Sequence, residues 1–257
     1  MEKIRLAQIK VYPVKGDLDI NQSRLLEILR EVESFKPDVV ITPECFLDGY
    51  VSTETFVTRD NIGDYAIDPN KSSYVDAVSE WAKRNNSWFI YGSTRLSEGG
   101  VYNSALIIDR LGDRVGIYDK VHCQNHDEKY LPGKSLPVFQ SDFGLFGVMI
   151  CADRRWPETV RSLALKGARI IFNPTYGAHD TLNEHMMQIR SYESEIFITF
   201  THPEQSLVTG PGGEIINNEK SADVNFAITE IDLAKSDRAR EKILAHLKDR
   251  RPDIYSL

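Results

Sequence analysis

The sequence predicts an α/β fold with one mixed β-sheet, or two packed sheets, and helices on the outside. Three observations lead to this prediction. The chain opens with a strand, a helix and a strand; its middle has two apolar runs that flank a short turn; its second half returns to alternating strands and helices. Alternation favours parallel pairing and hairpins pair antiparallel, so together they argue against a purely parallel doubly wound sheet.

The elements of the first half follow from the apolar periodicity. Residues 4–11 alternate apolar and polar like a half-buried strand, and residues 21–35 carry apolar side chains at helical spacing. Further along, we expect a short buried strand at 38–42, a helix at 74–84, a strand at 88–94, and a hairpin of 102–109 with 114–120 across Leu111-Gly112-Asp113.

The second half places a cysteine at a strand-to-helix turn. The apolar stretch 144–150 runs directly into Cys151, and Pro157 then suits the first turn of a helix that Gly167 ends. The remaining expected elements are a strand at 169–173, a helix at 182–194, a strand at 196–201, a hairpin across 210–213, and a helical charged tail from Lys235 to Pro252.

The composition predicts one domain, residues 1–257, because no repeat, low-complexity segment or proline-rich linker divides the chain. The net charge is -7 and no run of Lys or Arg stands out, so neither nucleic acid nor a membrane surface is expected as a partner. The charged amino-terminal residues do not form a signal peptide, and no stretch reaches transmembrane length. A cytoplasmic location is therefore predicted.

Polar side chains follow several of the apolar strands. Glu44 comes after VVITP, Lys120 after VGIYD, and Cys151 after FGVMI, while Glu128 lies in the loop before Leu131-Pro132-Gly133. Strand ends are where side chains converge on a site. A cysteine there becomes a nucleophile when a carboxylate takes its proton and an ammonium group stabilises the charge. Glu44 and Lys120 supply these two groups.

The segments that hold these residues resemble the nitrilase or carbon–nitrogen hydrolase superfamily. They are Pro43-Glu44, Tyr118-Asp119-Lys120-Val121-His122 and Cys151-Ala152-Asp153-Arg154-Arg155-Trp156-Pro157-Glu158. The resemblance covers essentially the whole chain. It implies a four-layer αββα sandwich of two mixed sheets with helices outside, a Glu-Lys-Cys triad, no cofactor, and a homo-oligomer to which the tail at 235–257 contributes contacts.

The same resemblance implies a fourth catalytic residue, a glutamate that orients the lysine and the hydrolytic water. Glu128 matches it, although the spacing from Glu128 to Pro132-Gly133 is shorter than in many relatives and is similar to that of the aliphatic amidases. The alternative for Glu128 is a solvated loop acid.

The residues after the nucleophile are similar to those of the N-carbamoyl-D-amino acid amidohydrolases. That similarity implies that Arg154 and Arg155 bind a substrate carboxylate, a task that suits the planar guanidinium group. His122, His126 and Tyr176 are the other expected substrate-binding residues. An internal salt bridge to Asp153 or Glu158 is the alternative for the arginines, and packing is the alternative for the histidines.

The predicted function is hydrolysis of a non-peptide C–N bond in a small amide through a Cys151 acyl-enzyme. Ala152, where the subfamily has Asn, and the short chain leave open an N-carbamoyl amino acid, an ω-amide or an aliphatic amide as substrate. An acyltransferase of the same fold and a transition-metal site made of His122, Cys123, His126 and Cys151 are rival interpretations; we expect no metal. Cys45 and Cys123 are predicted to pack as small buried hydrophobes.

Overall fold

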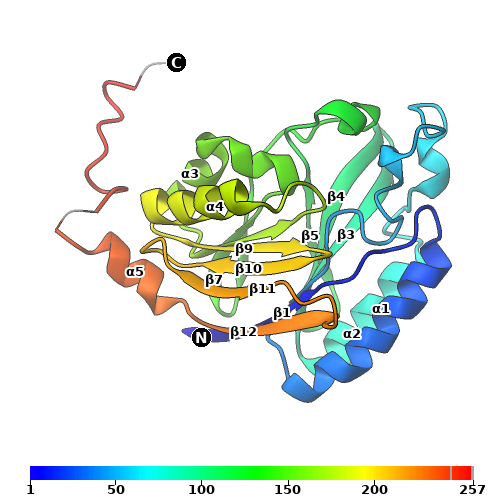
Figure 1. Ribbon diagram of the computed structural model, residues 1–257, viewed down its shortest axis with the longest axis horizontal. Helices are drawn as coiled ribbons and strands as arrows, with labels where there is room; N and C mark the ends of the chain where they lie inside the picture. The colour runs from blue at the N-terminus through cyan, green and yellow to red at the C-terminus, as the bar shows by residue number, and fades with distance from the viewer. Residues whose placement is uncertain (244, 256–257) are drawn as a thin grey trace.

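Two mixed six-stranded sheets lie face to face at the centre of the protein, with helices on their outer faces (Figure 1). The computed structural model describes residues 1–243 and 245–255. The predicted four-layer αββα sandwich is confirmed. The strand order is β12-β1-β2-β3-β4-β5 in the first sheet and β11-β10-β9-β8-β7-β6 in the second.

The strands are short and mostly buried on at least one face. Their bounds are β1 Lys3–Ile9, β2 Val39–Ile41, β3 Trp88–Ser97, β4 Gly100–Ile108, β5 Arg114–Asp119, β6 Val138–Ser141, β7 Gly144–Val148, β8 Ile170–Pro174, β9 Phe197–His202, β10 Gln205–Thr209, β11 Ile215–Glu219 and β12 Phe226–Asp232. The helices are α1 Leu18–Val32, α2 Ser73–Asn85, α3 Pro157–Leu165, α4 Thr181–Ser194 and α5 Ala234–Arg240. None of the described helices combines the length and the apolar character that crossing a membrane requires.

Three apolar layers hold the sandwich together. One lies between the sheets and contains residues of both, such as Ile90 and Phe172. The second packs α1 and α2 against the first sheet, and the third packs α3 and α4 against the second sheet. Because each sheet is apolar on both faces, its central strands read as continuous apolar runs rather than as alternating patterns.

The direction of the strands places the ends of several of them at one edge of the sandwich. β1, β2 and β3 are parallel, and β5 runs the same way because β4 is antiparallel to both β3 and β5. In the second sheet β7, β8 and β9 are parallel. Residues that follow β2, β5, β7 and β8 can therefore meet.

The tail differs from its prediction. Helix α5 ends at Arg240, and the described residues after it contain turns but no further helix. The backbone N–H groups of His246 and Leu247 donate to the carboxylate of Glu195, at 2.6 and 3.3 Å, instead of to a preceding turn. Tertiary hydrogen bonds thus replace helical ones in this segment.

Candidate active site

Cys151 lies at the start of a tight turn between β7 and α3. The turn is a 3-10 helix over Cys151–Arg155, and Cys151 itself has a φ of 44°, in the left-handed region. This conformation costs a non-glycine residue about 1–3 kcal/mol and persists only where surrounding contacts enforce it. Such a strained residue between a strand and a helix is typical of a functional side chain.

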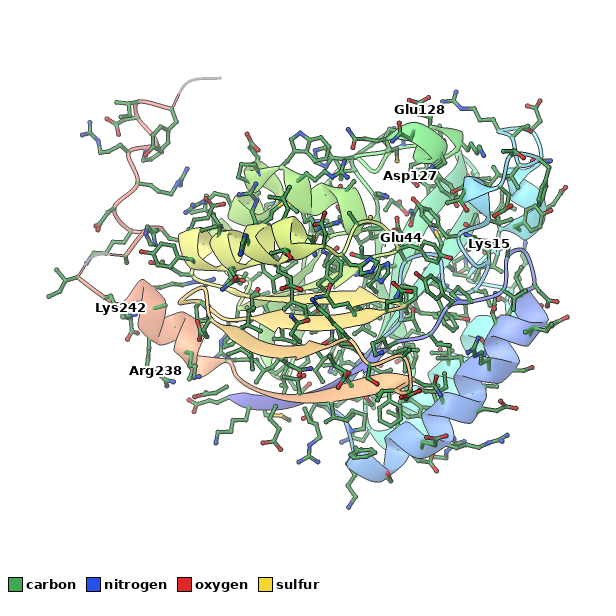
Figure 2. All side chains as sticks on the ribbon, in the orientation of Figure 1. Lys15, Glu44, Asp127, Glu128, Arg238 and Lys242 are labelled. Atoms are coloured by element: carbon green, nitrogen blue, oxygen red, sulfur yellow. The ribbon has the colours of Figure 1, made fainter. Side chains whose placement is uncertain are left out.

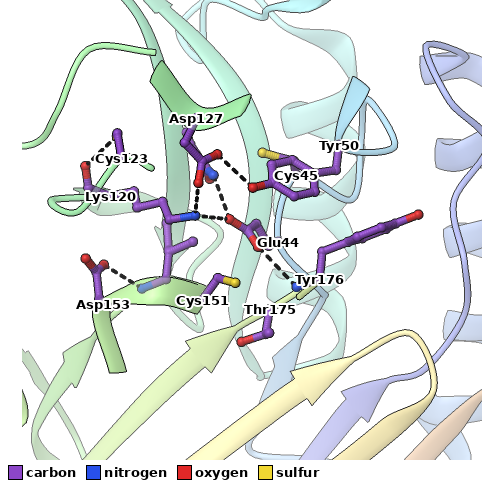
Figure 3. A network of polar contacts seen from close by, with 12 residues as sticks. Glu44, Cys45, Tyr50, Lys120, Cys123, Asp127, Cys151, Asp153, Thr175 and Tyr176 are labelled. Carbon is purple, nitrogen blue, oxygen red and sulfur yellow. Dashed lines mark hydrogen bonds and ion pairs between the residues drawn. The ribbon is translucent and has the colours of Figure 1, made fainter. Parts of the chain in front are cut away.

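The carboxylate of Asp153 enforces this turn and joins it to the end of β5. Its Oδ2 accepts the N–H of Ile150 at 2.9 Å and the hydroxyl of Tyr118 at 2.6 Å, while its Oδ1 accepts the N–H of His122 at 2.9 Å. The Asp153 side chain is fully buried. The segments that carry Cys151 and Lys120 are therefore tied to each other through one side chain (Figure 3).

Glu44 and Lys120 form a buried ion pair beside Cys151. Lys120 Nζ lies 2.6 Å from Glu44 Oε1, and the two residues are 1% and 0% exposed. The second donor to Oε1 is Asn103 Nδ2 at 2.8 Å, and the backbone N–H of Tyr176 donates to Glu44 Oε2 at 3.1 Å. Figure 3 shows the Cys151 side chain directed toward the space below this carboxylate.

Asp127, not Glu128, is the second carboxylate at Lys120. Asp127 Oδ2 pairs with Lys120 Nζ, and its Oδ1 accepts the hydroxyl of Tyr50 at 2.7 Å. Glu128 is exposed; its backbone carbonyl accepts from Arg59 Nε at 2.8 Å, and its carboxylate forms no salt bridge with any residue that the structure describes. The predicted contact of Glu128 with Lys120 is not formed, and Figure 2 shows Glu128 on the outer side of the turn that carries Asp127. A 3-10 helix has three residues per turn, so consecutive side chains on the turn Asn125–Lys129 point about 120° apart.

Arg154 is a buried cation beside the sulfur. It is 1% exposed, and its Nη1 donates to Cys151 Sγ at 3.5 Å. The rest of the guanidinium is held by Asn183 Oδ1 at 2.6 Å and by the carbonyl of Ala178 at 2.7 Å. Within residues 1–243 and 245–255 no carboxylate forms a salt bridge with it. The internal salt bridge considered for Arg154 is therefore not formed.

The other expected substrate-binding residues are dispersed. Arg155 is exposed and contacts Gln124 Oε1 at 3.2 Å, so it points away from the buried Arg154 and does not share its position. His122 Nδ1 lies 2.7 Å from Asp153 Oδ1, and its ring stacks on Trp156. His126 is exposed at the edge of the Tyr50 ring, whereas Tyr176 contacts the site through its backbone N–H.

The electrostatic balance favours a protonated Cys151 in the resting protein. Burial raises the pKa of the Cys151 thiol, and Glu44 raises it further, while Lys120 and Arg154 act in the opposite direction. Burial alone would lower the pKa of Lys120, but Glu44, the Cys151 sulfur and Asp127 raise it well above its usual range. Lys120 therefore stays an ammonium ion, and the thiol needs a base.

Gly177 brings no side chain next to the sulfur. A Cβ atom at this position would lie 3.1 Å from Cys151 Sγ, closer than side-chain contacts normally allow. Because Gly177 follows Tyr176, the same segment donates an N–H to Glu44 and keeps side-chain atoms away from the sulfur.

A group of side chains that could ligate a metal ion lies elsewhere in the described part of the chain. His179, His202 and Glu204 lie close enough to share an ion. Both ring nitrogens of His202 are used, because Nδ1 accepts the N–H of Glu204 at 3.0 Å and Nε2 bonds to the carbonyl of Tyr176 at 3.0 Å. The cluster is therefore a hydrogen-bonded network. Cys45 is fully buried, and Cys123 packs partly buried near it.

Comparison with known proteins identifies the family. Residues 3–241 match the family model described as carbon-nitrogen hydrolase. The chain belongs to the carbon-nitrogen hydrolase family. It is a hydrolase that acts on carbon–nitrogen bonds other than peptide bonds.

Named members of the carbon-nitrogen hydrolase family align over nearly the whole chain. It is 32% identical over 281 residues to the N-carbamoylputrescine amidase of Arabidopsis thaliana, covering 96% of this chain and 92% of that one. It is 29% identical to the omega-amidase NIT2 of Danio rerio, covering 100% and 98%. Nit3 of Saccharomyces cerevisiae has the same fold, with a TM-score of 0.81 at 21% identity and coverage of 94% of both chains.

Proposed function

We propose that this hydrolase is a thiol-dependent amidase that cleaves a small amide through a covalent acyl-enzyme on Cys151. The observation that carries the proposal is the placement of Cys151 on a strained turn, next to a buried cation and beside the Glu44–Lys120 ion pair. Arg154 is that cation. Few structural roles would require this set of buried charges in one place.

In the first half of the reaction, Glu44 takes the thiol proton as Sγ attacks the carbonyl carbon. The oxyanion accepts hydrogen bonds from Lys120 and from the backbone N–H of Ala152, each worth about 3 kcal/mol of barrier lowering in comparable sites. Glu44 then gives the proton to the departing amine, which breaks the C–N bond and leaves the acyl group on sulfur. Water, deprotonated by Glu44, releases the acid and restores the thiol.

Asp127 has a defined part in this cycle. When Glu44 accepts a proton, Lys120 loses that carboxylate as a counterion, but Asp127 remains paired with it. A buried ammonium ion without any counterion would cost several kcal/mol. Asp127 therefore holds Lys120 in place through both half-reactions.

The substrate class that we propose is an amide with a carboxylate near the reacting carbon, such as an N-carbamoyl amino acid. The support is Arg154, whose buried guanidinium has amide and carbonyl partners but no salt bridge to a described carboxylate. An ω-amide is the second candidate, because succinamate places its carboxylate as far from the amide carbon as N-carbamoylglycine does. A cationic substrate is disfavoured by the same arginine.

The test is a panel of N-carbamoyl D- and L-amino acids, succinamate, propionamide and ethylurea, with substrate consumption followed by chromatography. We expect turnover of the anionic compounds, loss of all turnover in Cys151→Ala, and retention in the matched variant Cys123→Ala. Unchanged hydrolysis in Cys151→Ala would refute the nucleophile. Turnover of uncharged amides alone would refute the substrate class, and turnover only with an added amine would identify an acyltransferase.

We also propose a homo-oligomer, to which the outer helices and the tail at 235–257 contribute. The support is a set of large apolar side chains that are exposed on α3 and α4, namely Leu165, Leu182, Ile189 and Tyr192. Sedimentation velocity with Leu182→Glu and Ile189→Glu tests this; an unchanged sedimentation coefficient in the double variant would contradict it.

A further inference from the structure

Lys15 is a second cation near the site that sequence motifs do not reveal. It lies in the loop between β1 and α1, and its Nζ donates to the carbonyl of Tyr50 at 3.0 Å and to Thr53 Oγ1 at 2.7 Å. The same ammonium group lies 4.4 Å from the centroid of the Tyr176 ring and 5.7 Å from that of Tyr50. Two tyrosine faces and two oxygen atoms therefore fix its position.

The two tyrosines connect Lys15 to the catalytic carboxylates. Tyr50 donates its hydroxyl to Asp127 at 2.7 Å, and Tyr176 donates its backbone N–H to Glu44 at 3.1 Å. Their ring centroids are 5.3 Å apart in an edge-to-face arrangement, and Figure 3 shows both residues near Glu44. Lys120 Nζ lies 5.8 Å from the centroid of the same Tyr50 ring that Lys15 approaches. The Tyr50 ring thus lies between Lys15 and the ion pairs of Lys120.

The charge of Lys15 is not matched by an adjacent carboxylate. Within the described residues no carboxylate lies within 4.0 Å of its Nζ. Burial lowers the pKa of Lys15, while the more distant Glu54 and Asp48 raise it. The chain as a whole carries a net charge of -7, so a lysine near the nucleophile without an adjacent carboxylate stands out against the acidic character of the protein.

We propose that Lys15 is a specificity-determining residue that attracts and orients the anionic end of the substrate. The inference rests on the proposed amidase function and deepens it: Arg154 lies at the nucleophile, and Lys15 supplies positive charge on the side of the tyrosine pair. The anionic end of a substrate that reaches Cys151 past the tyrosine pair is attracted by the charge of Lys15, whereas a neutral amide gains no such attraction. Lys15 contributes to binding and leaves the chemical step at Cys151 unchanged.

The hydrogen bonds of Lys15 allow charge and structure to be separated. Gln at this position keeps an N–H donor for the Tyr50 carbonyl but removes the charge, and Arg keeps the charge. Lys242 is a matched control because it is exposed beyond α5, on the opposite side of the molecule from Lys15 (Figure 2).

The experiment compares succinamate with propionamide, which differ by one carboxylate. In Lys15→Gln we expect kcat/KM for succinamate to fall about 10-fold, mainly through KM, and kcat/KM for propionamide to change less than about twofold. Lys15→Arg should restore the preference, and Lys242→Gln should not alter it. Raising NaCl from about 0.05 M to about 0.5 M should reduce the succinamate preference of the wild type more than that of Lys15→Gln.

Equal losses for both substrates would show that Lys15 only supports the Tyr50 loop, and no loss for succinamate would show that its charge is irrelevant. Either result overturns the proposal. The amidase function itself is tested separately with Cys151→Ala. If this variant still turned over propionamide and succinamate, the proposed function would fail independently of Lys15.

Discussion

Replacing Asp127 by Asn tests the second carboxylate at Lys120, which the sequence predicted to be Glu128 and the structure shows to be Asp127. The substitution is isosteric: the amide oxygen can still accept from Lys120, and the amide group can still contact the Tyr50 hydroxyl. Only the negative charge is lost. Glu128→Gln is the matched control, because it removes the same charge one residue further along on an exposed side chain.

The expected magnitude follows from the counterions of Lys120. In the wild type, proton transfer to Glu44 leaves Lys120 paired with Asp127, but in Asp127→Asn it leaves a buried ammonium ion without a carboxylate. Breaking one partner of a buried pair costs about 3–5 kcal/mol. The developing oxyanion of the substrate recovers part of this energy, so we expect a barrier increase of about 2–3 kcal/mol, or a loss of about 30- to 150-fold in kcat/KM.

The assay is steady-state hydrolysis of the best substrate, together with thermal unfolding of each variant. Asp127→Asn should lose activity without a large fall in Tm, because the resting protein keeps the neutral Lys120–Glu44 pair. Glu128→Gln should retain activity within about twofold. If Glu128→Gln lost activity and Asp127→Asn did not, the assignment of the second carboxylate would be wrong.

Three further predictions concern the surroundings of the nucleophile and the stability of the fold. Gly177→Ala should lower kcat/KM by at least about 10-fold with little change in Tm, since the new Cβ would occupy the space 3.1 Å from Cys151 Sγ; full activity would contradict an approach over Gly177. Arg154→Gln should raise the pKa of Cys151 further, because Arg154 lowers it, so the pH midpoint of iodoacetamide alkylation should move upward; a midpoint that stays or falls would contradict the contact. His202→Gln should reduce acid sensitivity: burial lowers the pKa of His202 from 6.5 to about 3, so native stability is complete above about pH 6.5 and is lost as the pH falls toward 3. In urea unfolding, the free energy of unfolding should fall between pH 8 and pH 4 by about 3 kcal/mol less in the variant than in the wild type. An identical pH dependence of the two proteins would refute this role of His202.

The apolar pattern predicted most central elements of the fold but not those with weak patterns. α1, α2 and α4 fall within a few residues of their predicted bounds because one face of each packs on a sheet. β10 and β11 form the hairpin that was predicted across 210–213, whereas β6 and β12 were not predicted. β6 and β12 lie at sheet edges with partly exposed residues. The turn that joins β9 to β10 was also missed, because its two residues, Pro203-Glu204, lack the usual glycine signal.

In the site, too, some residues could be predicted from a sequence motif, whereas others depend on tertiary contacts. Glu44, Lys120 and Cys151 could be selected because each follows an apolar strand, and the structure brings them together. Asp127 could not be separated from its neighbour Glu128, since the register of a short 3-10 turn decides which carboxylate is inside. The parallel direction of β2 and β5, which no local pattern encodes, makes the meeting possible.

Asn103 and Lys15 illustrate residues that sequence reasoning missed. Asn103 lies within an otherwise ordinary strand and meets Glu44 only through the pairing of β3 with β4. Lys15 is a loop lysine, a residue type that is usually solvated. Its tertiary contacts with Tyr50, Thr53 and Tyr176, which no local pattern encodes, distinguish it from a solvated lysine.

The covalent intermediate on Cys151 is the most direct test of the account. The protein would be mixed with N-carbamoylglycine or succinamate, quenched with acid within the first turnovers, digested and analysed by mass spectrometry. We predict an acyl adduct on the Cys151 peptide, none on the Cys45 or Cys123 peptides, and neither adduct nor turnover in Cys151→Ala. Turnover that continues in Cys151→Ala would contradict the central claim.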